Sequence, residues 1–391
     1  MQSSLDKTAT PIEFLGILGG GQLGRFFTIA AQKMGYAVVV FDPDDKSPAG
    51  KIANMHICKP YDDLEALDQL KNTCSLVTTE FENIPAETLR YLEKDIVVRP
   101  SSKAISIAQN RIKEKDFLKR CGIPVGTYFV IDTIESISKL DSNKALMFPG
   151  ILKRAEFGYD GKGQMHVNNK AELEAGFIAF NSVPCTLELK LDLDCEFSVV
   201  LARSVDGQFV VYPVIRNHHE EGILDVSFVS GIDPERDEHA CISLAKKVAN
   251  ELSYIGVMAV EFFMSQGNLF VNEIAPRPHN SGHFSIDACV YNQFDQQVLT
   301  LTGNKPRNEE MQFPKSAMLN ILGDLWFREG RLIEPKFEMI SGPGVILHLY
   351  GKNEPRKGRK MGHITVLGLG GETGKEILQR VEELRKILWE N

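Results

Sequence analysis

The stretch Val257-Met-Ala-Val-Glu-Phe-Phe-Met-Ser-Gln-Gly-Asn-Leu-Phe-Val-Asn-Glu-Ile-Ala-Pro276 holds two runs of strand-forming residues separated by Gln266-Gly267. Such runs around a short polar turn predict a β-hairpin. Folding about the turn brings Glu261 level with Asn272 or Glu273, so two carboxylates and an amide share one sheet face. Mg²⁺ binds oxygen ligands, usually carboxylates together with substrate phosphates. The hairpin therefore predicts a metal site formed by Glu261 and Glu273; the alternative is a buried salt bridge to Arg or Lys.

A second stretch, Lys153-Arg-Ala-Glu-Phe-Gly-Tyr-Asp-Gly-Lys-Gly-Gln164, is basic and rich in glycine. Its glycines allow the backbone to fold tightly over phosphates with N–H groups as donors, and Lys153 can place an ammonium on phosphate oxygens. The alternative is a surface hairpin with a flexible tip. A mobile cationic segment facing two strand carboxylates is suited to a nucleoside triphosphate and its Mg²⁺. Together the two stretches predict an ATP-driven ligation.

The N-terminal part of the chain alternates strand-like and helical segments. Phe14–Leu18 and Ala37–Phe41 are predicted strands around a helix, and Leu76 begins a third strand. This alternation predicts an α/β unit with a parallel sheet. The turn Gly19-Gly-Gly-Gln-Leu-Gly24 and the later Asp42 fit the dinucleotide fingerprint. Because any helix N-terminus attracts anions, the turn is compatible with NAD(P), with another phosphorylated molecule, or with a purely structural role.

The loop Ala275-Pro-Arg-Pro-His-Asn-Ser-Gly-His283 follows the hairpin directly. Its prolines fix the backbone and present Arg277, His279 and Asn280 from a rigid segment, where a guanidinium can hold a small anion or a developing negative charge. The alternative is a zinc site that uses His279 and His283. Farther along, the run Lys352-Asn-Glu-Pro-Arg-Lys-Gly-Arg-Lys360 is either a solvated loop or a phosphate clamp. Between these features, residues 106–121 are predicted to form one charged amphipathic helix.

The length and composition of the chain limit the kinds of protein that it can be. The 391 residues are enough for two or three domains, and 43% hydrophobic with 25% charged residues is typical of a globular protein. The net charge of −8 argues against a nucleic-acid partner. No apolar run approaches the roughly 20 residues that span a membrane. The start lacks the features of a signal peptide, and the seven cysteines form no Cys-x-x-Cys pair, so we expect a cytoplasmic protein with reduced thiols.

Several motifs resemble those of the ATP-grasp enzymes. They follow one another in the order found in one family of these enzymes, the N5-carboxyaminoimidazole ribonucleotide synthetases. The resemblance covers nearly the whole chain beyond residues 1–10. It implies an ATP-grasp fold of α/β and α+β character, with a Rossmann-like domain over residues 1–100, a core over 101–310 with a mobile lid at about 125–190, and a small C-terminal domain over 311–391. The motifs that carry it are Gly19–Arg25, Thr79–Asn83, Arg99–Ser101, Phe157–Gln164, Asn272–His283 and Gly358–His363.

The resemblance also implies roles for individual residues. Binding of ATP phosphates, adenine and ribose is implied for Arg111, Lys153, Gly158, Tyr159, Asp160, Gly161, Lys162, Gly163, Gln164, Glu188, Leu189, Lys190, Leu191, Glu196, His219, Asn272 and Glu273. Catalysis is implied for Tyr159, Arg277, His279 and Asn280, and binding of one or two Mg²⁺ or Mn²⁺ ions for Glu261 and Glu273. Binding of the aminoimidazole substrate is implied for Gln22, Leu23, Glu80, Lys352, Arg359 and Lys360. One departure is Leu189, where the family usually has Lys; backbone contacts to adenine tolerate that change.

The implied reaction uses ATP and bicarbonate to carboxylate 5-aminoimidazole ribonucleotide, through carboxyphosphate, and the family suggests a homodimer. A formate-dependent glycinamide ribonucleotide transformylase is the nearest alternative, since it shares the flap, the metal hairpin and the Arg-Pro-His turn. An NAD-dependent dehydrogenase would leave the flap and both strand glutamates unexplained. A third alternative is a protein that binds nucleotide without catalysis.

Overall fold

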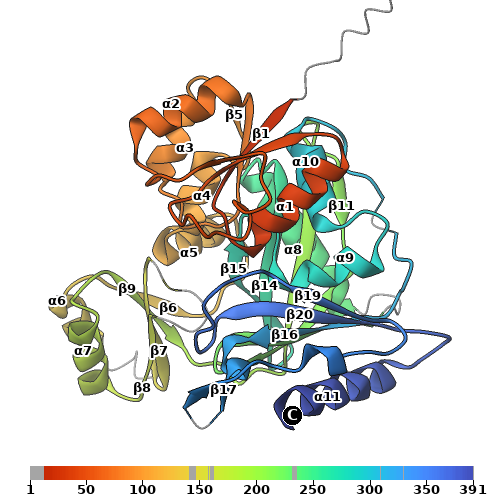
Figure 1. Ribbon diagram of the computed structural model, residues 1–391. Coiled ribbons are helices and arrows are strands. Elements are labelled where there is room, and N and C mark those ends of the chain that lie inside the picture. Colours follow the sequence, from red (N-terminus) through yellow and green to blue (C-terminus); the bar gives the residue numbers. More distant parts are fainter. Residues whose placement is uncertain are drawn as a thin grey trace, which may run out of the picture.

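The computed structural model describes residues 13–140, 147–156, 158, 163–230, 236–308, 310–328 and 330–390 (Figure 1). Its N-terminal unit is a five-stranded, wholly parallel sheet in the order β3-β2-β1-β4-β5. The predicted strands and the α/β character are confirmed. Apolar clusters cover both faces of this sheet, beneath the helices. The elements are β1 (Phe14–Leu18), α1 (Gln22–Lys33), β2 (Ala37–Phe41), β3 (Met55–Ile57), α2 (Leu64–Thr73), β4 (Leu76–Thr79), α3 (Ala86–Leu92) and β5 (Val97–Val98).

The predicted helix over residues 106–121 is wrong, because two helices occupy this region. α4 (Ser102–Ala108) and α5 (Arg111–Arg120) are separated by a break at Gln109-Asn110. Asn110 adopts an extended backbone, and its side chain accepts hydrogen bonds from the N–H groups of Ile112 and Lys113, which makes it the N-cap of α5. The charged periodicity continued across the break and concealed it. The cap places Arg111 in the first turn of α5, facing the cavity described below.

The subdomain that follows has its own sheet and its own apolar core. Its strands form a four-stranded antiparallel sheet in the order β6-β9-β7-β8. The apolar cluster between this sheet and its helices draws only on residues 129–189. In Figure 1 the subdomain stands to one side of the molecule. Its elements are β6 (Tyr128–Ile131), α6 (Ile134–Ser138), β7 (Gly150–Arg154), β8 (Gln164–Val167), α7 (Lys170–Ala179) and β9 (Cys185–Leu189).

Nine further strands build one large sheet, in which the C-terminal strands β16, β20 and β19 continue the sheet of the hairpin. The order is β15-β14-β10-β12-β13-β16-β20-β19, with β11 beside β10. The predicted hairpin is confirmed as β14 (Gly256–Ser265) and β15 (Asn268–Ala275). The other strands are β10 (Cys195–Arg203), β11 (Phe209–Val211), β12 (Ile215–Glu220), β13 (Ile223–Val229), β16 (Ser316–Leu322), β19 (Val345–Leu349) and β20 (Lys360–Leu367).

Helices cover both faces of the large sheet and fix which hairpin residues face the site. Val260 and Phe262 pack against α8 (Arg236–Glu251) on one face. Alternation therefore turns Glu261 to the opposite face, where the segment 280–301 packs. That segment contains η2 (Asn280–Phe284), α9 (Ser285–Ala288) and α10 (Gln293–Leu301); the last elements are η3 (Gly323–Trp326), β17 (Phe327–Arg328), β18 (Arg331–Leu332), η4 (Phe337–Met339) and α11 (Gly374–Glu390).

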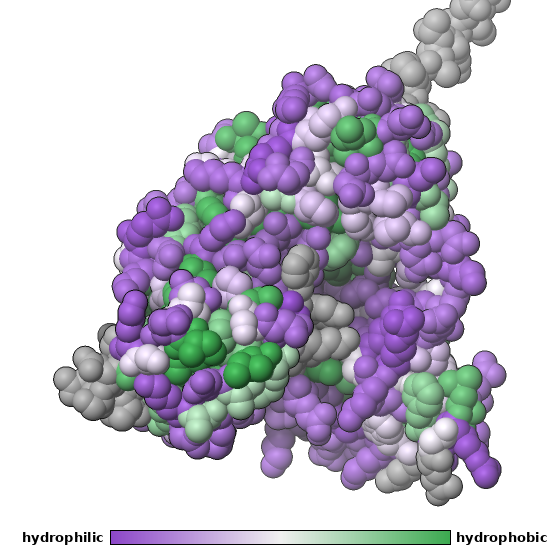
Figure 2. Space-filling view, turned by 90° about the vertical axis from the view of Figure 1, so that its left-hand side faces the viewer, coloured by the Kyte–Doolittle hydropathy of each residue, from purple (hydrophilic) through white to green (hydrophobic). Residues whose placement is uncertain are grey.

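The N-terminal unit, the hairpin region and the C-terminal strands meet around the ring of Phe26. This ring lies 5.5 Å from the ring of His283, 5.9 Å from Tyr350 and 5.1 Å from Phe294, measured between centroids. The aromatic contacts therefore hold α1 against the loop that carries His279. Figure 2 shows that the face carrying α6 and α7 is mostly hydrophilic, with hydrophobic side chains in small groups. Within the described residues, no helix combines the length and the hydropathy needed to cross a membrane.

Candidate active site

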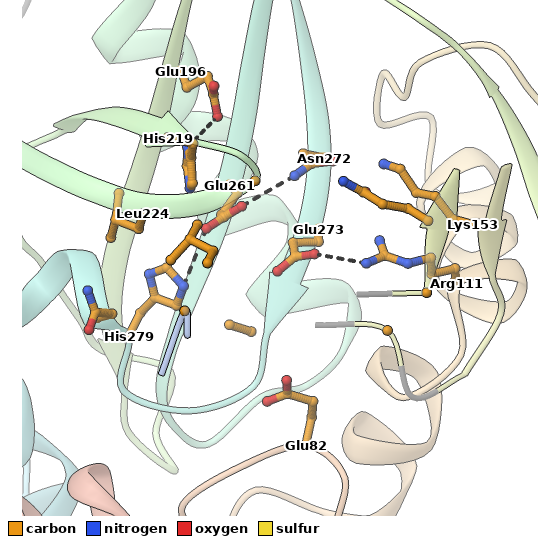
Figure 3. A pocket seen from close by; sticks show the side chains of 18 of the residues that line it. Glu82, Arg111, Lys153, Glu196, His219, Leu224, Glu261, Asn272, Glu273 and His279 are labelled. Carbon is orange, nitrogen blue, oxygen red and sulfur yellow. Dashed lines mark hydrogen bonds and ion pairs between the residues drawn. The ribbon is translucent and has the colours of Figure 1, made fainter. Parts of the chain in front are cut away.

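The hairpin brings its two glutamates to one face, as predicted. Glu261 and Glu273 are paired in the register of β14 and β15, and a β-bulge follows immediately. Strict alternation would turn Asn272 to the other face, but the extra residue of the bulge lets it point the same way. Its Nδ2 donates to Oε2 of Glu261 at 3.3 Å (Figure 3). Two carboxylates and an amide therefore line the same space.

The acidic pair has the properties of a divalent cation site. Burial, followed by the charge of Glu273, raises the pKa of Glu261 from 4.5 to about 7. Oδ1 of Asn272 is buried and has no hydrogen-bond partner among the described residues. Carboxylates that repel each other beside an unused amide oxygen match the oxygen ligands that Mg²⁺ prefers. The donor set therefore fits the predicted metal.

Cations approach the acidic pair from the opposite side of the cavity (Figure 3). Nη2 of Arg111 lies 3.6 Å from Oε2 of Glu273. Nζ of Lys153 lies 3.0 Å from Oε2 of Glu188, and Nζ of Lys115 lies 3.4 Å from the same oxygen. Burial lowers the pKa of Lys153. Although burial alone would raise it, the charges of Lys153, Lys115 and Arg111 hold the pKa of Glu188 well below its usual range.

Lys115 and the side chain of Glu188 are parts of the site that sequence reasoning missed. Glu188 was predicted only for the backbone contacts of the adenine segment, yet its carboxylate holds two lysines. Lys115 is only 2% exposed and lies one helical turn after Arg111 on α5. The i, i+4 spacing of Arg111 and Lys115 was the available signal, since both side chains then lie on one helix face.

The far end of the cavity holds Glu196 and His219, two of the residues predicted to bind the nucleotide. Nδ1 of His219 lies 2.7 Å from Oε2 of Glu196. Their strands β12 and β10 are neighbours in the sheet, which accounts for the approach. Burial lowers the pKa of His219, but the carboxylates of Glu196 and Glu261 raise it above the usual value overall. A histidine and a carboxylate are thus fixed side by side at the edge of the nucleotide-sized space.

The loop after the hairpin points Arg277, His279 and Asn280 into the same cavity. Arg277 makes a two-pronged ion pair with Glu82, through Nε to Oε2 and through Nη2 to Oε1 at 3.2 Å. Nε2 of His279 lies 3.3 Å from Oε1 of Glu261. Burial and the charge of Arg277 hold the pKa of His279 well below its usual range, so the ring is neutral. Both amide atoms of Asn280 are buried and lack a partner within the described part of the chain.

The glycine-rich turn before α1 binds an anion, but that anion is a side chain of the protein. The N–H groups of Gly21 and Gly24 each donate to a carboxylate oxygen of Glu80 at 2.6 Å. The N–H of Gly20 donates to Oδ2 of Asp42 at 2.8 Å. Internal carboxylates therefore occupy the donors that the dinucleotide interpretation assigned to a phosphate. The helix N-terminus attracts an anion, as expected, and in the structure that anion is the carboxylate of Glu80.

The zinc alternative at His279 and His283 finds no geometric support. Nδ1 of His279 is 2.8 Å from the hydroxyl of Ser281, and Nδ1 of His283 is 3.1 Å from the amide of Gln293. A different group, Asp287 with His348 and His363, has its possible ligand atoms within 4.8 Å of one another. The two rings of that group are stacked with planes 20° apart. In-plane lone pairs on nearly parallel rings do not converge on one ion.

One cavity of about 1260 Å³ joins these parts. Lys190 is exposed and does not line it, and Tyr159, Asp160, Gly161 and Lys162 lie outside the described residues. The basic segment predicted as a clamp lies at its rim, where Nζ of Lys352 donates to the carbonyl oxygen of Lys360 at 2.6 Å. The predicted residues among those that line the cavity are Gln22, Leu23, Glu80, Arg111, Lys153, Gly158, Gly163, Gln164, Glu188, Leu189, Leu191, Glu196, His219, Glu261, Asn272, Glu273, Arg277, His279, Asn280, Lys352, Arg359 and Lys360.

Three family models match successive parts of the chain. They are a ribonucleotide synthetase preATP-grasp domain over residues 12–109, an ATP-grasp domain over residues 116–294, and a phosphoribosylaminoimidazole carboxylase C-terminal domain over residues 316–378. The predicted ATP-grasp fold, with its added N-terminal and C-terminal parts, is thereby confirmed.

Relatives of known name are similar over almost the full chain. The N5-carboxyaminoimidazole ribonucleotide synthase of Staphylococcus aureus strain COL is 39% identical over 355 residues, which is 90% of this chain and 92% of that protein. The enzyme of the same name from Bacillus subtilis strain 168 is 37% identical over 358 residues, 91% of this chain and 92% of that protein.

Solved structures agree with these relatives. A Staphylococcus aureus N5-carboxyaminoimidazole synthetase in complex with ADP has a TM-score of 0.85 and 36% identity, covering 96% of this chain and 97% of that chain. A structure of the Aspergillus clavatus N5-carboxyaminoimidazole synthase contains ADP and 5-aminoimidazole ribonucleotide; its TM-score is 0.84 at 28% identity, with 96% and 98% covered. These matches support neither the transformylase nor the dehydrogenase alternative.

Proposed function

The chain belongs to the N5-carboxyaminoimidazole ribonucleotide synthase family, and from that membership we propose how its cavity carries out the reaction. The protein is an ADP-forming carbon–nitrogen ligase of purine biosynthesis. ATP phosphorylates bicarbonate to carboxyphosphate, and the exocyclic amine of 5-aminoimidazole ribonucleotide attacks that species or the CO₂ released from it. The products are N5-carboxyaminoimidazole ribonucleotide, ADP and phosphate. Phosphorylation is needed because hydroxide is a poor leaving group and phosphate a good one.

One observation carries this proposal: Glu261 and Glu273 face Arg111 and Lys153 across the cavity. Arg111 and Lys153 lie where they can hold the phosphates of ATP, while Glu261, Glu273 and Asn272 would hold one or two Mg²⁺ or Mn²⁺ ions. The metal, when bound, would supply positive charge that offsets the negative charge of the phosphate oxygens. Lys153 has to exchange Glu188 for a phosphate oxygen, and Lys115 can remain on Glu188 and preserve its charge balance.

The other cavity residues divide between the ends of the two substrates. Glu196 and His219 are proposed to hold the ribose end of ATP, and backbone groups of residues 188–191 the adenine. Arg277, His279 and Asn280, with Tyr159, are proposed to surround bicarbonate. Gln22, Leu23 and Glu80 are proposed to face the aminoimidazole ribonucleotide, and Lys352, Arg359 and Lys360 its 5′-phosphate. Glycine-rich residues 158–164 would cover the phosphates and exclude water, because carboxyphosphate hydrolyses readily. A cytoplasmic homodimer completes the proposal.

The test is ADP release measured with bicarbonate and 5-aminoimidazole ribonucleotide present together or omitted singly. We expect release to require both, and expect formate with glycinamide ribonucleotide to give none. The variant Glu273→Gln should lose turnover while keeping the circular dichroism of the unchanged protein. Near-normal turnover of that variant would remove the metal assignment. Release with formate and glycinamide ribonucleotide would overturn the assigned reaction.

A further inference from the structure

A row of polar side chains leads across the sheet to the ring of His279. Oγ of Ser281 lies 2.8 Å from Nδ1 of His279 and 2.7 Å from Oγ of Ser198. Nδ2 of Asn217 is 3.0 Å from Oγ of Ser198, and Oγ of Ser227 is 3.2 Å from Oδ1 of Asn217. Ser198 and Ser281 are completely buried, and Ser227 is 1% exposed. Four side chains, none of them predicted to contact a substrate, are therefore connected to a residue of the active site.

The register of the sheet explains why these side chains meet. Ser198 of β10 is paired with Glu261 of β14, and Asn217 of β12 is paired with Ser227 of β13. Paired residues on antiparallel strands present their side chains to the same face. The row therefore crosses β10, β12 and β13 on the sheet face that carries Glu261 and Glu273. Ser281 of η2 joins the row through its hydrogen bond with Ser198.

One backbone contact and the amide of Asn217 together give the hydrogen bonds of the row a single consistent direction. The N–H of Ser281 points to Nδ1 of His279 at 3.4 Å, and an N–H can only donate, so Nδ1 carries a lone pair. The hydroxyl of Ser281 must then donate to Nδ1 and accept from Ser198. Ser198 in turn accepts from the amide NH₂ of Asn217, whose oxygen accepts from Ser227. Each hydroxyl donates once along the row, with no conflict at either end.

The backbone of His279 is held as firmly as its ring. The side chain of Gln293, at the start of α10, accepts from the N–H of His279 and donates to its carbonyl oxygen, both at 2.8 Å. The position from which the ring extends is therefore fixed, and the contact with the hydroxyl of Ser281 sets the side to which Nδ1 points. Because Nδ1 accepts the N–H of Ser281, the ring proton lies on Nε2, which faces Oε1 of Glu261 at 3.3 Å.

We propose that Ser281, Ser198, Asn217 and Ser227 are positioning residues that hold His279 in the Nε2–H tautomer, so that the ring offers an N–H donor to the cavity. A ring in this form cannot take a proton through Nε2. Its role toward an oxyanion in the cavity is therefore to donate a hydrogen bond, without acting as the base. The identity of that oxyanion as bicarbonate or carboxyphosphate rests on the proposed function, whereas the tautomer does not.

The tautomer can be observed directly. In protein labelled with ¹⁵N-histidine, two-bond ¹H–¹⁵N correlation spectra distinguish the Nε2–H from the Nδ1–H form, and His279→Asn identifies the signal by its loss. We expect the Nε2–H pattern in the unchanged protein. Asn217→Asp keeps the shape of the side chain but removes the amide donor, so Ser198 must donate to it and the order of bonds reverses. We expect that variant to shift His279 toward the Nδ1–H form.

Kinetics give a second readout. Asn217→Asp should lower kcat about tenfold or more, as for loss of one hydrogen bond to a charged group, with the KM for ATP unchanged. Ser281→Ala should also lower kcat, because only the long backbone bond then holds Nδ1. The matched control is Ser316→Ala, since Oγ of Ser316 is buried without a partner among the described residues. It should leave both the tautomer and kcat unchanged.

Two results would overturn the proposal. One is an Nδ1–H pattern for His279 in the unchanged protein, which needs no variant to fold. The other is a lower kcat in Asn217→Asp or Ser281→Ala with the tautomer unaltered, which would mean a merely structural role. If the unchanged protein releases no ADP with bicarbonate and 5-aminoimidazole ribonucleotide, the proposed function fails, and the spectrum still decides the tautomer.

Discussion

Replacing Glu261 by Gln should stabilise the protein at pH 8 when no metal is present. The same substitution should abolish ATP turnover when Mg²⁺ is present. Burial and the charge of Glu273 raise the pKa of Glu261 from 4.5 to about 7. The folded protein therefore holds this proton more tightly than the unfolded chain does. The stabilisation from that proton is fully present below pH 4.5 and is lost as the pH rises through about 7. The amide introduced by Glu261→Gln would carry no charge and would avoid this loss.

The magnitude follows from the two pKa values. The interval between 4.5 and about 7, at about 1.36 kcal/mol per pKa unit, corresponds to roughly 3 kcal/mol at pH 8. This is an upper value, because the substitution also alters the contacts to Asn272 and His279. In a chain of this size it should raise the apparent Tm by several degrees.

The assay is thermal unfolding in EDTA at pH 5 and pH 8. We expect the gain in Tm to be large at pH 8 and much smaller at pH 5, where Glu261 is already protonated. Adding Mg²⁺ at pH 8 should raise the Tm of the unchanged protein and leave that of the variant nearly constant. The control Glu334→Gln removes an exposed carboxylate and should do neither. An equal gain at both pH values, or a loss at pH 8, would refute the reasoning.

Three further predictions follow from other contacts. Glu188→Gln leaves the ammoniums of Lys153 and Lys115 buried without their shared carboxylate, so the free energy of unfolding at pH 7 should fall by roughly 3–5 kcal/mol. Since the pKa of Glu188 is lowered in the folded protein, the difference between the two proteins in urea unfolding should shrink as the pH falls below about 4.5. Mg²⁺ must displace the proton of Glu261, so calorimetry should show affinity weakening below pH 7 with proton release, and a pH-independent affinity would contradict this. Asn110→Ala removes the cap of α5 and should cost about 0.5–2 kcal/mol in thermal unfolding and raise the KM for ATP, whereas Asn308→Ala, outside any helix, should do neither.

Local patterns were sufficient for the hairpin. Its apolar runs and the Gln266-Gly267 turn determine the register within one residue, and the placement of Glu261 and Glu273 on one face follows from alternation. The bulge at Asn272 could not be predicted from the sequence, because an extra residue in one strand changes neither the composition of the hairpin nor its apolar pattern. The prediction left Asn272 and Glu273 open as partners of Glu261, and the bulge explains why both are.

Contacts between distant segments were the part that the sequence could not supply. Glu80 binds the turn before α1 across 59 residues, and Glu82 binds Arg277 across 195. Such pairs depend on how the sheet and the loop are packed, since neither partner carries a local signal for the other. Lys115 did carry a local signal, because its helical spacing from Arg111 puts both side chains on one face of α5.

The separate apolar core of the β6–β9 subdomain has a thermodynamic consequence. Because its cluster draws only on residues 129–189, a rotation of this subdomain as one body exposes little apolar surface. The contacts that it changes include polar ones, such as Lys115 with Glu188 and Tyr128 with Asp116. Heat-capacity changes scale with the apolar surface that becomes hydrated. The enthalpy of such a rotation should therefore be almost constant across temperature, and the balance between its two positions should respond to ionic strength more than to heat.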